Sequence, residues 1–180
     1  MGLNMQTDRS TIKNPVAVVG RGGTQTAELL RRLLPGPVVE LTPCQAALYE
    51  GRCRAVVVEN FDLPWDGSLS GCAVARWALS ARSGVTVVGL DDPEGRRLAA
   101  ACPETVYAYS DGRPQADLTA KHVRLRGERL EFVALAGGEL TRVRVSAGKS
   151  PRLYDHLAAL AGALALGVPL TDAAARLSER

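Results

Sequence analysis

The sequence lacks the long apolar run that a membrane span requires. A spanning helix needs roughly 18 or more consecutive apolar residues, and no stretch of this chain approaches that length. Residues 1–14 contain no apolar signal-peptide core, so they are expected to form a flexible leader. These absences predict a cytoplasmic protein. The length of 180 residues predicts that residues 15–180 form a single domain.

Closely spaced cysteines are also missing. The four cysteines, Cys44, Cys53, Cys72 and Cys102, form no Cys-x-x-Cys pair, which argues against a zinc ribbon. Disulfide scaffolds are typical of short secreted chains, whereas this chain has 180 residues and no signal peptide. We therefore expect reduced cysteines that pack as small core residues.

The excess of charge of one sign is small. The chain has 22 Lys and Arg against 19 Asp and Glu, a net charge of +3 that is spread along the sequence. Hydrophobic residues make up 46% and charged residues 23%, which is ordinary for a globular protein. This composition predicts neither a nucleic-acid partner nor a membrane span. His122, in an alternating and solvent-facing segment, and His156 have no serine or cysteine partner in a recognisable motif, so a hydrolase triad is unsupported.

A strand, a glycine-rich loop and a helix open the domain. Residues 16–19 are a short β-branched run typical of a buried strand, and residues 24–34 carry one apolar helical face. This arrangement presents backbone N–H groups to a phosphate. The candidate anion-binding loop comprises Gly20, Arg21, Gly22, Gly23, Thr24, Gln25 and Thr26.

The loop misses the charged parts of a P-loop. Thr24 stands where the lysine that reaches the phosphates is expected, and Gln25 stands where the magnesium-binding hydroxyl is expected. The dinucleotide fingerprint also fails, because Gln25 replaces its third glycine. Two interpretations remain: a turn that binds nothing, and a cradle that binds phosphate or sulfate weakly through backbone amides. A rival hypothesis is that Arg21, Glu40 or Asp62 folds over the loop and fills it.

Strands and helices then alternate as far as residue 110. The apolar patterns predict strands at 38–41, 54–59, 85–90 and 105–110, a polar loop at 60–70, and helices at 42–50, 71–81 and 93–101. The expected fold class is α/β, a mostly parallel sheet with helices on both faces and the strand at 16–19 in a central position.

The pattern changes after residue 111. The segments 117–126, 129–136 and 139–145 alternate apolar and polar residues and are separated by short turns, which predicts an antiparallel meander with one solvated face. A helix over 153–166 is expected to end at Gly167, and Thr171 is expected to cap a last short helix that reaches Leu177.

Together these segments resemble the central ATP-binding domain of the Mur ligases, which build peptidoglycan precursors, and of the related folylpolyglutamate synthetases. The opening VAVVGRGG resembles the family's phosphate loop, VELTPCQ its E-[LV]-S-S segment, and VVGLDDP its V-x-N-x-D-D motif. Residues 157–169 resemble the closing helix of that domain. The resemblance implies a P-loop-like α/β fold and, for an active member, a need for ATP and magnesium.

Departures from the family pattern fall where the resemblance places its chemistry. The phosphate-binding lysine of the family corresponds to Thr24, its adenine-contacting Asn to Gly89, and its carbamylated lysine to Arg76. The histidine-containing loop of the family corresponds to residues 61–67, which contain no histidine. Most of the positive charge that the family brings to the phosphates is therefore missing.

Three acids remain as candidate chemical groups. Glu40 corresponds to a magnesium ligand of the family, although one carboxylate holds magnesium only weakly. Asp91 and Asp92 follow a predicted strand end. Asp92 precedes Pro93, so the pair also fits the N-cap of a helix, and we favour that interpretation.

Two functions fit this pattern. The first is a degenerate, catalytically inactive Mur-ligase-like pseudoenzyme linked to cell-wall precursor biosynthesis. It would bind a protein partner, a second copy of itself or a small anion, and would need no cofactor. The alternative is an ATP-dependent amide (peptide) ligase domain that works with separate substrate-binding subunits. Because phosphoryl transfer depends on positioned positive charge, the sequence favours the pseudoenzyme, with no catalytic residue.

Overall fold

Helices and strands follow one another in the expected order in this computed structural model, which describes residues 14–20, 25–59, 82–102, 105–146 and 152–178. The strands are β1 (Val16–Val19), β2 (Val38–Leu41), β3 (Ala55–Val58), β4 (Val85–Gly89), β5 (Thr105–Ser110), β6 (Leu118–Arg126), β7 (Arg129–Ala136) and β8 (Glu139–Ser146). The helices are α1 (Gln25–Leu33), α2 (Pro43–Leu48), α4 (Pro93–Ala101), α5 (Leu153–Ala165) and α6 (Leu170–Ser178). The loop expected at 60–70 and the helix expected at 71–81 lie outside the described residues.

All the strands belong to one sheet in the order β2-β1-β3-β4-β5-β6-β7-β8. From β2 to β6 every neighbouring pair is parallel, and β7 and β8 continue the sheet in antiparallel pairing. This confirms the α/β fold class and the antiparallel meander. Strand β1 is interior, with Val16 paired to Val38 on one side and to Ala55 on the other, but it lies second from the edge rather than in the middle.

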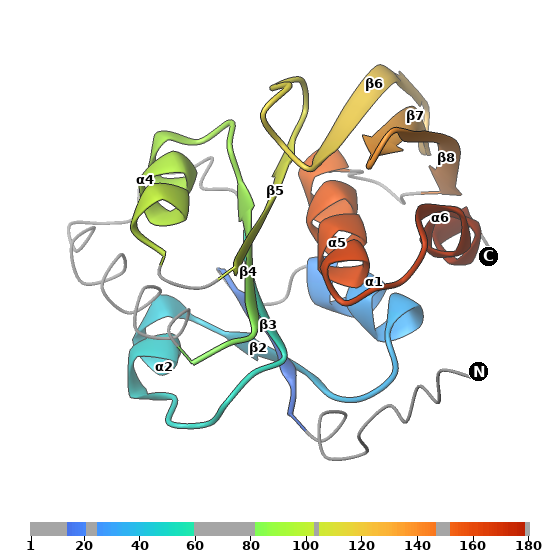
Figure 1. Cartoon of the computed structure of the whole chain (residues 1–180). Coiled ribbons are helices and arrows are strands. Elements are labelled where there is room, and N and C mark those ends of the chain that lie inside the picture. Colours follow the sequence, from blue (N-terminus) through green and yellow to red (C-terminus); the bar gives the residue numbers. More distant parts are fainter. Residues whose placement is uncertain (1–13, 21–24, 60–81, 103–104, 147–151, 179–180) are drawn as a thin grey trace, which may run out of the picture.

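Helices cover both faces of the parallel part (Figure 1), and the alternation of β1 shows why both faces must be covered. Val16 and Val18 belong to the larger core cluster, which includes buried residues of α1 and α5. Ala17 and Val19 belong to the smaller cluster on the opposite face, toward α2 and α4. A strand that is apolar at every position can be buried only between two layers of helices. The continuous apolar run in the sequence and the helices on both faces therefore both follow from burial of the strand on its two sides.

The meander of β6, β7 and β8 buries one face and exposes the other. Alternate residues of β7 are buried, Phe132 completely, and they continue the larger core cluster. The turn residues Gly127 and Gly137 have φ of 60° and 57°, in the left-handed region that glycine adopts without strain. Strand β6 contains a bulge between Lys121 and Arg124, next to the exposed His122, whose φ is 54°.

The expected cap of α4 is confirmed. The Asp92 carboxylate accepts a hydrogen bond from the Glu94 N–H at 2.9 Å, and Pro93 occupies the first turn. The expected cap of α6 is wrong. That helix begins at Leu170, and the Ala173 N–H donates to the Pro169 carbonyl at 3.0 Å, so Thr171 already lies inside the first turn.

Two cysteine side chains are described, and both are free thiols. Burial raises the pKa of Cys53 to about 11, although a hydrogen bond with Tyr49 offsets part of that effect. The Cys102 thiol donates to the Thr86 hydroxyl at 3.3 Å. Cys53 is buried, as expected for a core cysteine, whereas Cys102 is only half-buried. Within the described ranges, no helix is both long enough and apolar enough to cross a membrane.

Helix α4 packs so closely on β4 that a side chain at Gly95 has no room. A Cβ atom there would lie 1.9 Å from the Gly89 carbonyl oxygen, which cannot move without disturbing the strand. We therefore expect Gly95→Ala to lower the free energy of unfolding by about 1–3 kcal/mol, the usual cost of overpacking. Urea unfolding followed by circular dichroism measures this change. Gly112→Ala is the control, because a Cβ at Gly112 has nothing within 4 Å, and equal stability losses in the two variants would contradict the prediction.

Candidate functional site

The carboxyl ends of the parallel strands meet at one edge of the sheet, where open α/β folds bind their ligands. Gly20 follows β1 and Glu59 follows β3. The Gly20 N–H donates to the Leu41 carbonyl at 3.1 Å, and the Glu59 N–H donates to the Val19 carbonyl at 3.2 Å. These bonds place the first glycine of the candidate loop beside Glu59.

The Glu59 side chain lies directly against Gly20. A Cβ atom built on Gly20 would be 1.8 Å from Glu59 Oε2 and 2.7 Å from Cδ, so the carboxylate occupies the space that a side chain at position 20 would need. Sequence reasoning named Arg21, Glu40 and Asp62 as residues that could fill the loop and missed Glu59. Its position at the end of a buried strand was the only available signal.

The rest of the candidate loop is described in part. Residues 21–24, which include Arg21, Gly22, Gly23 and Thr24, lie outside the described residues. Gln25 begins α1 and is partly buried. Thr26 is fully buried, and its hydroxyl oxygen has no hydrogen-bond partner in the described structure. A role of the loop in anion binding stays a prediction.

Glu40 lies on the edge strand β2 and forms an ion pair with Arg31 of α1. Its Oε1 is 3.1 Å from the Arg31 guanidinium, which also donates to the Val38 carbonyl at 3.3 Å. Glu40 is paired in register with Val18, whose side chain belongs to the core cluster that includes α1. The carboxylate is therefore tied to a helix on this face of the sheet, and magnesium binding by Glu40 stays a prediction.

Asp91 organises the chain that follows β5. Its carboxylate accepts hydrogen bonds from the Ser110 hydroxyl at 2.6 Å and the Asp111 N–H at 2.8 Å, and the Arg113 guanidinium lies 3.6 Å away. Ser110 in turn accepts hydrogen bonds from the N–H groups of Gly112 and Arg113. With Asp92 serving as the helix cap, both acids have structural roles that account for their positions.

Tyr109 occupies the space next to Gly89, the position that corresponds to the adenine-contacting Asn of the family. A Cβ at Gly89 would lie 3.1 Å from Cζ of the tyrosine ring. The ring is fully buried, and its hydroxyl donates to the Val58 carbonyl at 3.2 Å. The aromatic side chain therefore fills the room that a larger residue at position 89 would need.

The surroundings of Tyr109 are acidic. Burial, followed by the negative charges of Glu59, Asp155 and Asp91, holds the pKa of the Tyr109 phenol well above its usual range. Three carboxylates from two strand ends and from α5 thus act on one buried hydroxyl.

Two described contacts lie at the positions where the resemblance places ATP phosphates and magnesium. A carboxylate lies against the first glycine of the loop, and Glu40 is already paired with an arginine. Among the described residues, no group of three His, Cys, Asp or Glu side chains is arranged to hold a metal ion.

The chain has the α/β fold of the Mur ligases, which confirms the resemblance at the level of the fold. One similar structure is a UDP-N-acetylmuramoyl-L-alanyl-D-glutamate–2,6-diaminopimelate ligase, with a TM-score of 0.78 and 16% identity over 92% of this chain and 46% of that one. A second is MurF from Acinetobacter baumannii, with a TM-score of 0.78 and 17% identity over 94% of this chain and 46% of that one.

A pseudomurein peptide ligase type C from Methanothermus fervidus is also similar, with a TM-score of 0.73 and 13% identity over 93% of this chain and 49% of that one. The chain spans about half the length of these solved structures. No protein-family model matches the sequence. No curated protein matches it either.

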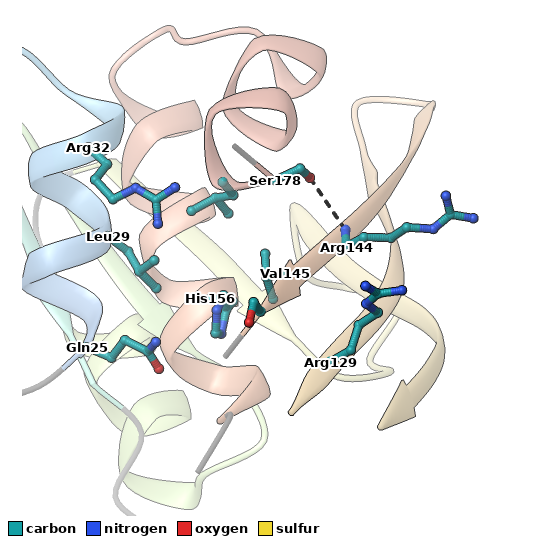
Figure 2. Close-up of a pocket in the computed structure, with 10 residues that line it drawn as sticks. Gln25, Leu29, Arg32, Arg129, Arg144, Val145, His156 and Ser178 are labelled. Carbon is teal, nitrogen blue, oxygen red and sulfur yellow. Dashed lines mark hydrogen bonds between the residues drawn. The ribbon is translucent and has the colours of Figure 1, made fainter. Parts of the chain in front are cut away.

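A separate hollow of about 760 Å³ lies beside α1, bordered by α5, α6 and the meander (Figure 2). Gln25, Arg32 and His156 face it, and His156 is almost fully buried. The Arg152 carbonyl lies 2.9 Å from His156 Nδ1, which therefore carries the proton as a donor. Burial lowers the pKa of His156, and the nearby Arg32 adds to this effect, whereas the hydrogen bond and Asp155 oppose it.

This lowered pKa makes stability depend on pH. The unfolded histidine takes up its proton near pH 6.5, whereas the folded histidine takes it up only at lower pH. The unfolded state therefore binds more protons below about pH 6.5, and acidification through this window favours unfolding. We expect His156→Gln to show a shallower loss of stability between pH 7.5 and pH 5 in urea unfolding. Equal slopes for the variant and the parent chain would contradict this expectation.

Proposed function

We propose that this chain is a Mur-ligase-like domain without ligase chemistry, a pseudoenzyme that acts by binding. Its ligand would be a protein partner or a second copy of the chain, with an indirect link to cell-wall precursor biosynthesis. The Mur-ligase fold supports this origin, and the solved structures that share it are ligases of murein and pseudomurein peptides.

The observation that carries the proposal is the Glu59 carboxylate against Gly20. In a phosphate loop, the glycines allow the backbone to turn tightly and to approach the nucleotide phosphates. A carboxylate against the first of these glycines occupies volume that a phosphate would need. Thr24, where the family has a lysine, brings no positive charge to a phosphate, because its side chain is neutral.

The contact between the Tyr109 ring and Gly89 supports the same conclusion for the adenine end of a nucleotide. The ring of Tyr109 fills the space next to the position that corresponds to the adenine-contacting Asn. The hydroxyl donates to the Val58 carbonyl, and the negative charges of Glu59, Asp155 and Asp91 help to raise its pKa. Both the phosphate side and the adenine side of a family-like site are thus occupied by the chain's own side chains.

An ATP-dependent amide ligase domain remains the alternative function, and the high structural similarity to active ligases favours it. Under that alternative, separate subunits would supply the parts of the ligases that this chain does not match. The two functions differ in one measurable property, because only the ligase domain must bind ATP and magnesium.

We expect no ATP hydrolysis and no ATP binding tighter than about 100 μM. A dissociation constant near 1 μM would correspond to a binding free energy of about −8 kcal/mol. Isothermal titration calorimetry with ATP and magnesium tests this. Inorganic phosphate, titrated without magnesium, is expected to bind at most weakly to the parent chain and at least threefold more tightly to Glu59→Gln. Glu50→Gln, which removes an exposed charge on the loop before β3, is the matched control.

A low-micromolar dissociation constant for ATP, or measurable turnover, would overturn the pseudoenzyme proposal in favour of the ligase. Equal phosphate binding by Glu59→Gln and Glu50→Gln would show that the Glu59 carboxylate is not what closes the loop.

A further inference from the structure

The outward face of the meander gathers the positive charge that the sequence spreads out. This cationic face is the side of β6, β7 and β8 opposite the buried Phe132 and Val143. The strand register brings six basic side chains onto it, all of them exposed: Lys121, Arg124, Arg126, Arg129, Arg142 and Arg144.

The bulge in β6 makes this possible. Lys121 pairs with Val133 and Arg124 pairs with Glu131, so two residues of β6 oppose one residue of β7 between these pairs. In a regular strand, side chains alternate between faces, and Arg124 would lie on the face opposite to Lys121. The extra residue restores the same face, so Lys121, Arg124 and Arg126 all project outward.

The charge on this face is poorly compensated. Its one acid is Glu131, whose Oε1 lies 3.5 Å from Arg142 and 3.4 Å from Arg144, so that it holds both guanidinium groups in place. Six basic groups and one acid make a net charge of +5, whereas the whole chain carries +3. All other residues together therefore carry −2. Positive charge is concentrated on one face rather than distributed over the molecule.

The basic groups form three rows across the strands. Neighbouring strands lie about 4.8 Å apart, and outward residues of one strand repeat about every 6.8 Å, so the rows cover roughly 10 by 14 Å. Figure 2 shows Arg129 and Arg144 at the meander, with Arg144 projecting away from the hollow. The face borders that hollow, because Arg129 and Arg144 also line it.

The composition of the face indicates which partner it fits. Five of the six basic residues are arginines, whose planar fork binds phosphate through two hydrogen bonds. Protein–protein interfaces place charge at the rim and apolar groups at the centre, whereas the middle of this face holds Glu131, which is ion-paired with Arg142 and Arg144. Nucleic-acid interfaces are much more positively charged. Its outward strand positions include no aromatic residue on which an unpaired base could stack, which favours a duplex over a single strand.

We propose that the cationic face binds the phosphate backbone of a nucleic-acid duplex without reading its bases. The proposal goes beyond the pseudoenzyme function and does not depend on the nucleotide loop. It also replaces the expectation of no nucleic-acid partner, which rested on a small net charge spread along the sequence. Binding of this kind is dominated by the release of counterions from the phosphates, so it weakens steeply with salt.

The test is fluorescence anisotropy of the full chain with labelled DNA and RNA duplexes of about 20 base pairs between 50 and 300 mM salt. Neutralising five phosphates predicts a slope of about −4.5 for the logarithm of the association constant against the logarithm of the salt concentration. We expect Arg126→Gln/Arg129→Gln to reduce the steepness by about 1.8 and to weaken binding at 50 mM salt at least tenfold. Duplexes of different sequence should bind within threefold of one another.

The matched control is Arg52→Gln/Arg97→Gln, which removes the same charge from exposed positions before β3 and on α4. It should leave the slope unchanged. Circular dichroism melting confirms that each variant is folded, and Lys121→Gln/Arg124→Gln repeats the test on β6 if the first pair is unstable. Equal losses in test and control variants would overturn the proposal, as would no duplex binding at 50 mM salt.

Two further binding measurements distinguish a nucleic-acid duplex from other polyanions. Vesicles with phosphatidylserine test a membrane surface, and poly-glutamate of matched charge tests an acidic protein segment. We expect both to bind at least tenfold more weakly than the duplex at the same salt concentration. Binding of either one as tight as the duplex would overturn the assignment to nucleic acid.

Discussion

The burial of the parallel strands on both faces is the constraint on which the rest of this structure depends. Strands β1 and β3 are apolar at every position, and their side chains are almost fully removed from water. Each fully buried valine contributes about 1.5–3 kcal/mol through the hydrophobic effect. Helices must therefore lie on both sides, and polar side chains can follow these strands only where the strands end. The candidate site forms at those ends for this reason.

At that edge, two glycines at strand ends are in contact with side chains of neighbouring strands. Glu59 fills the space at Gly20, and the Tyr109 ring fills the space at Gly89. Each glycine lacks a side chain, and in each case a residue from a neighbouring strand end uses the vacant volume. The same absence of a Cβ that leaves room for a nucleotide in a phosphate loop here allows the protein to pack against itself.

The two proposed sites have opposite electrostatic character and lie on different parts of the fold. Carboxylates act on Tyr109 at the carboxyl edge of the parallel strands, whereas six basic groups project from the meander. The whole chain has a net charge of only +3 because the −2 carried by all other residues offsets part of the +5 on the cationic face. A small net charge therefore does not imply a uniform surface, and the partners of such a protein depend on which face they meet.

The sequence by itself determined the fold class and the order of the elements. Continuous apolar runs such as residues 16–19 and 55–58 can be satisfied only by burial on both faces, and alternating segments such as 129–136 can be satisfied only with one solvated face. Local chemistry also predicted the cap at Asp92, because Asp followed by Pro favours a helix start wherever it stands. The cap at Thr171 failed, since the Pro169 carbonyl begins the helix earlier.

Only the tertiary structure decided what the sites contain. The contact of Glu59 with Gly20 joins the ends of two strands that are far apart in sequence, and no local pattern encodes it. The cationic face depends on a bulge that shifts the phase of β6 beyond Lys121. Strict alternation, which is all that sequence periodicity can supply, would place Arg124 and Arg126 on the face opposite to Lys121. A change of register by one residue moves a side chain from one face of a sheet to the other, so the surface charge follows from the pairing of the strands.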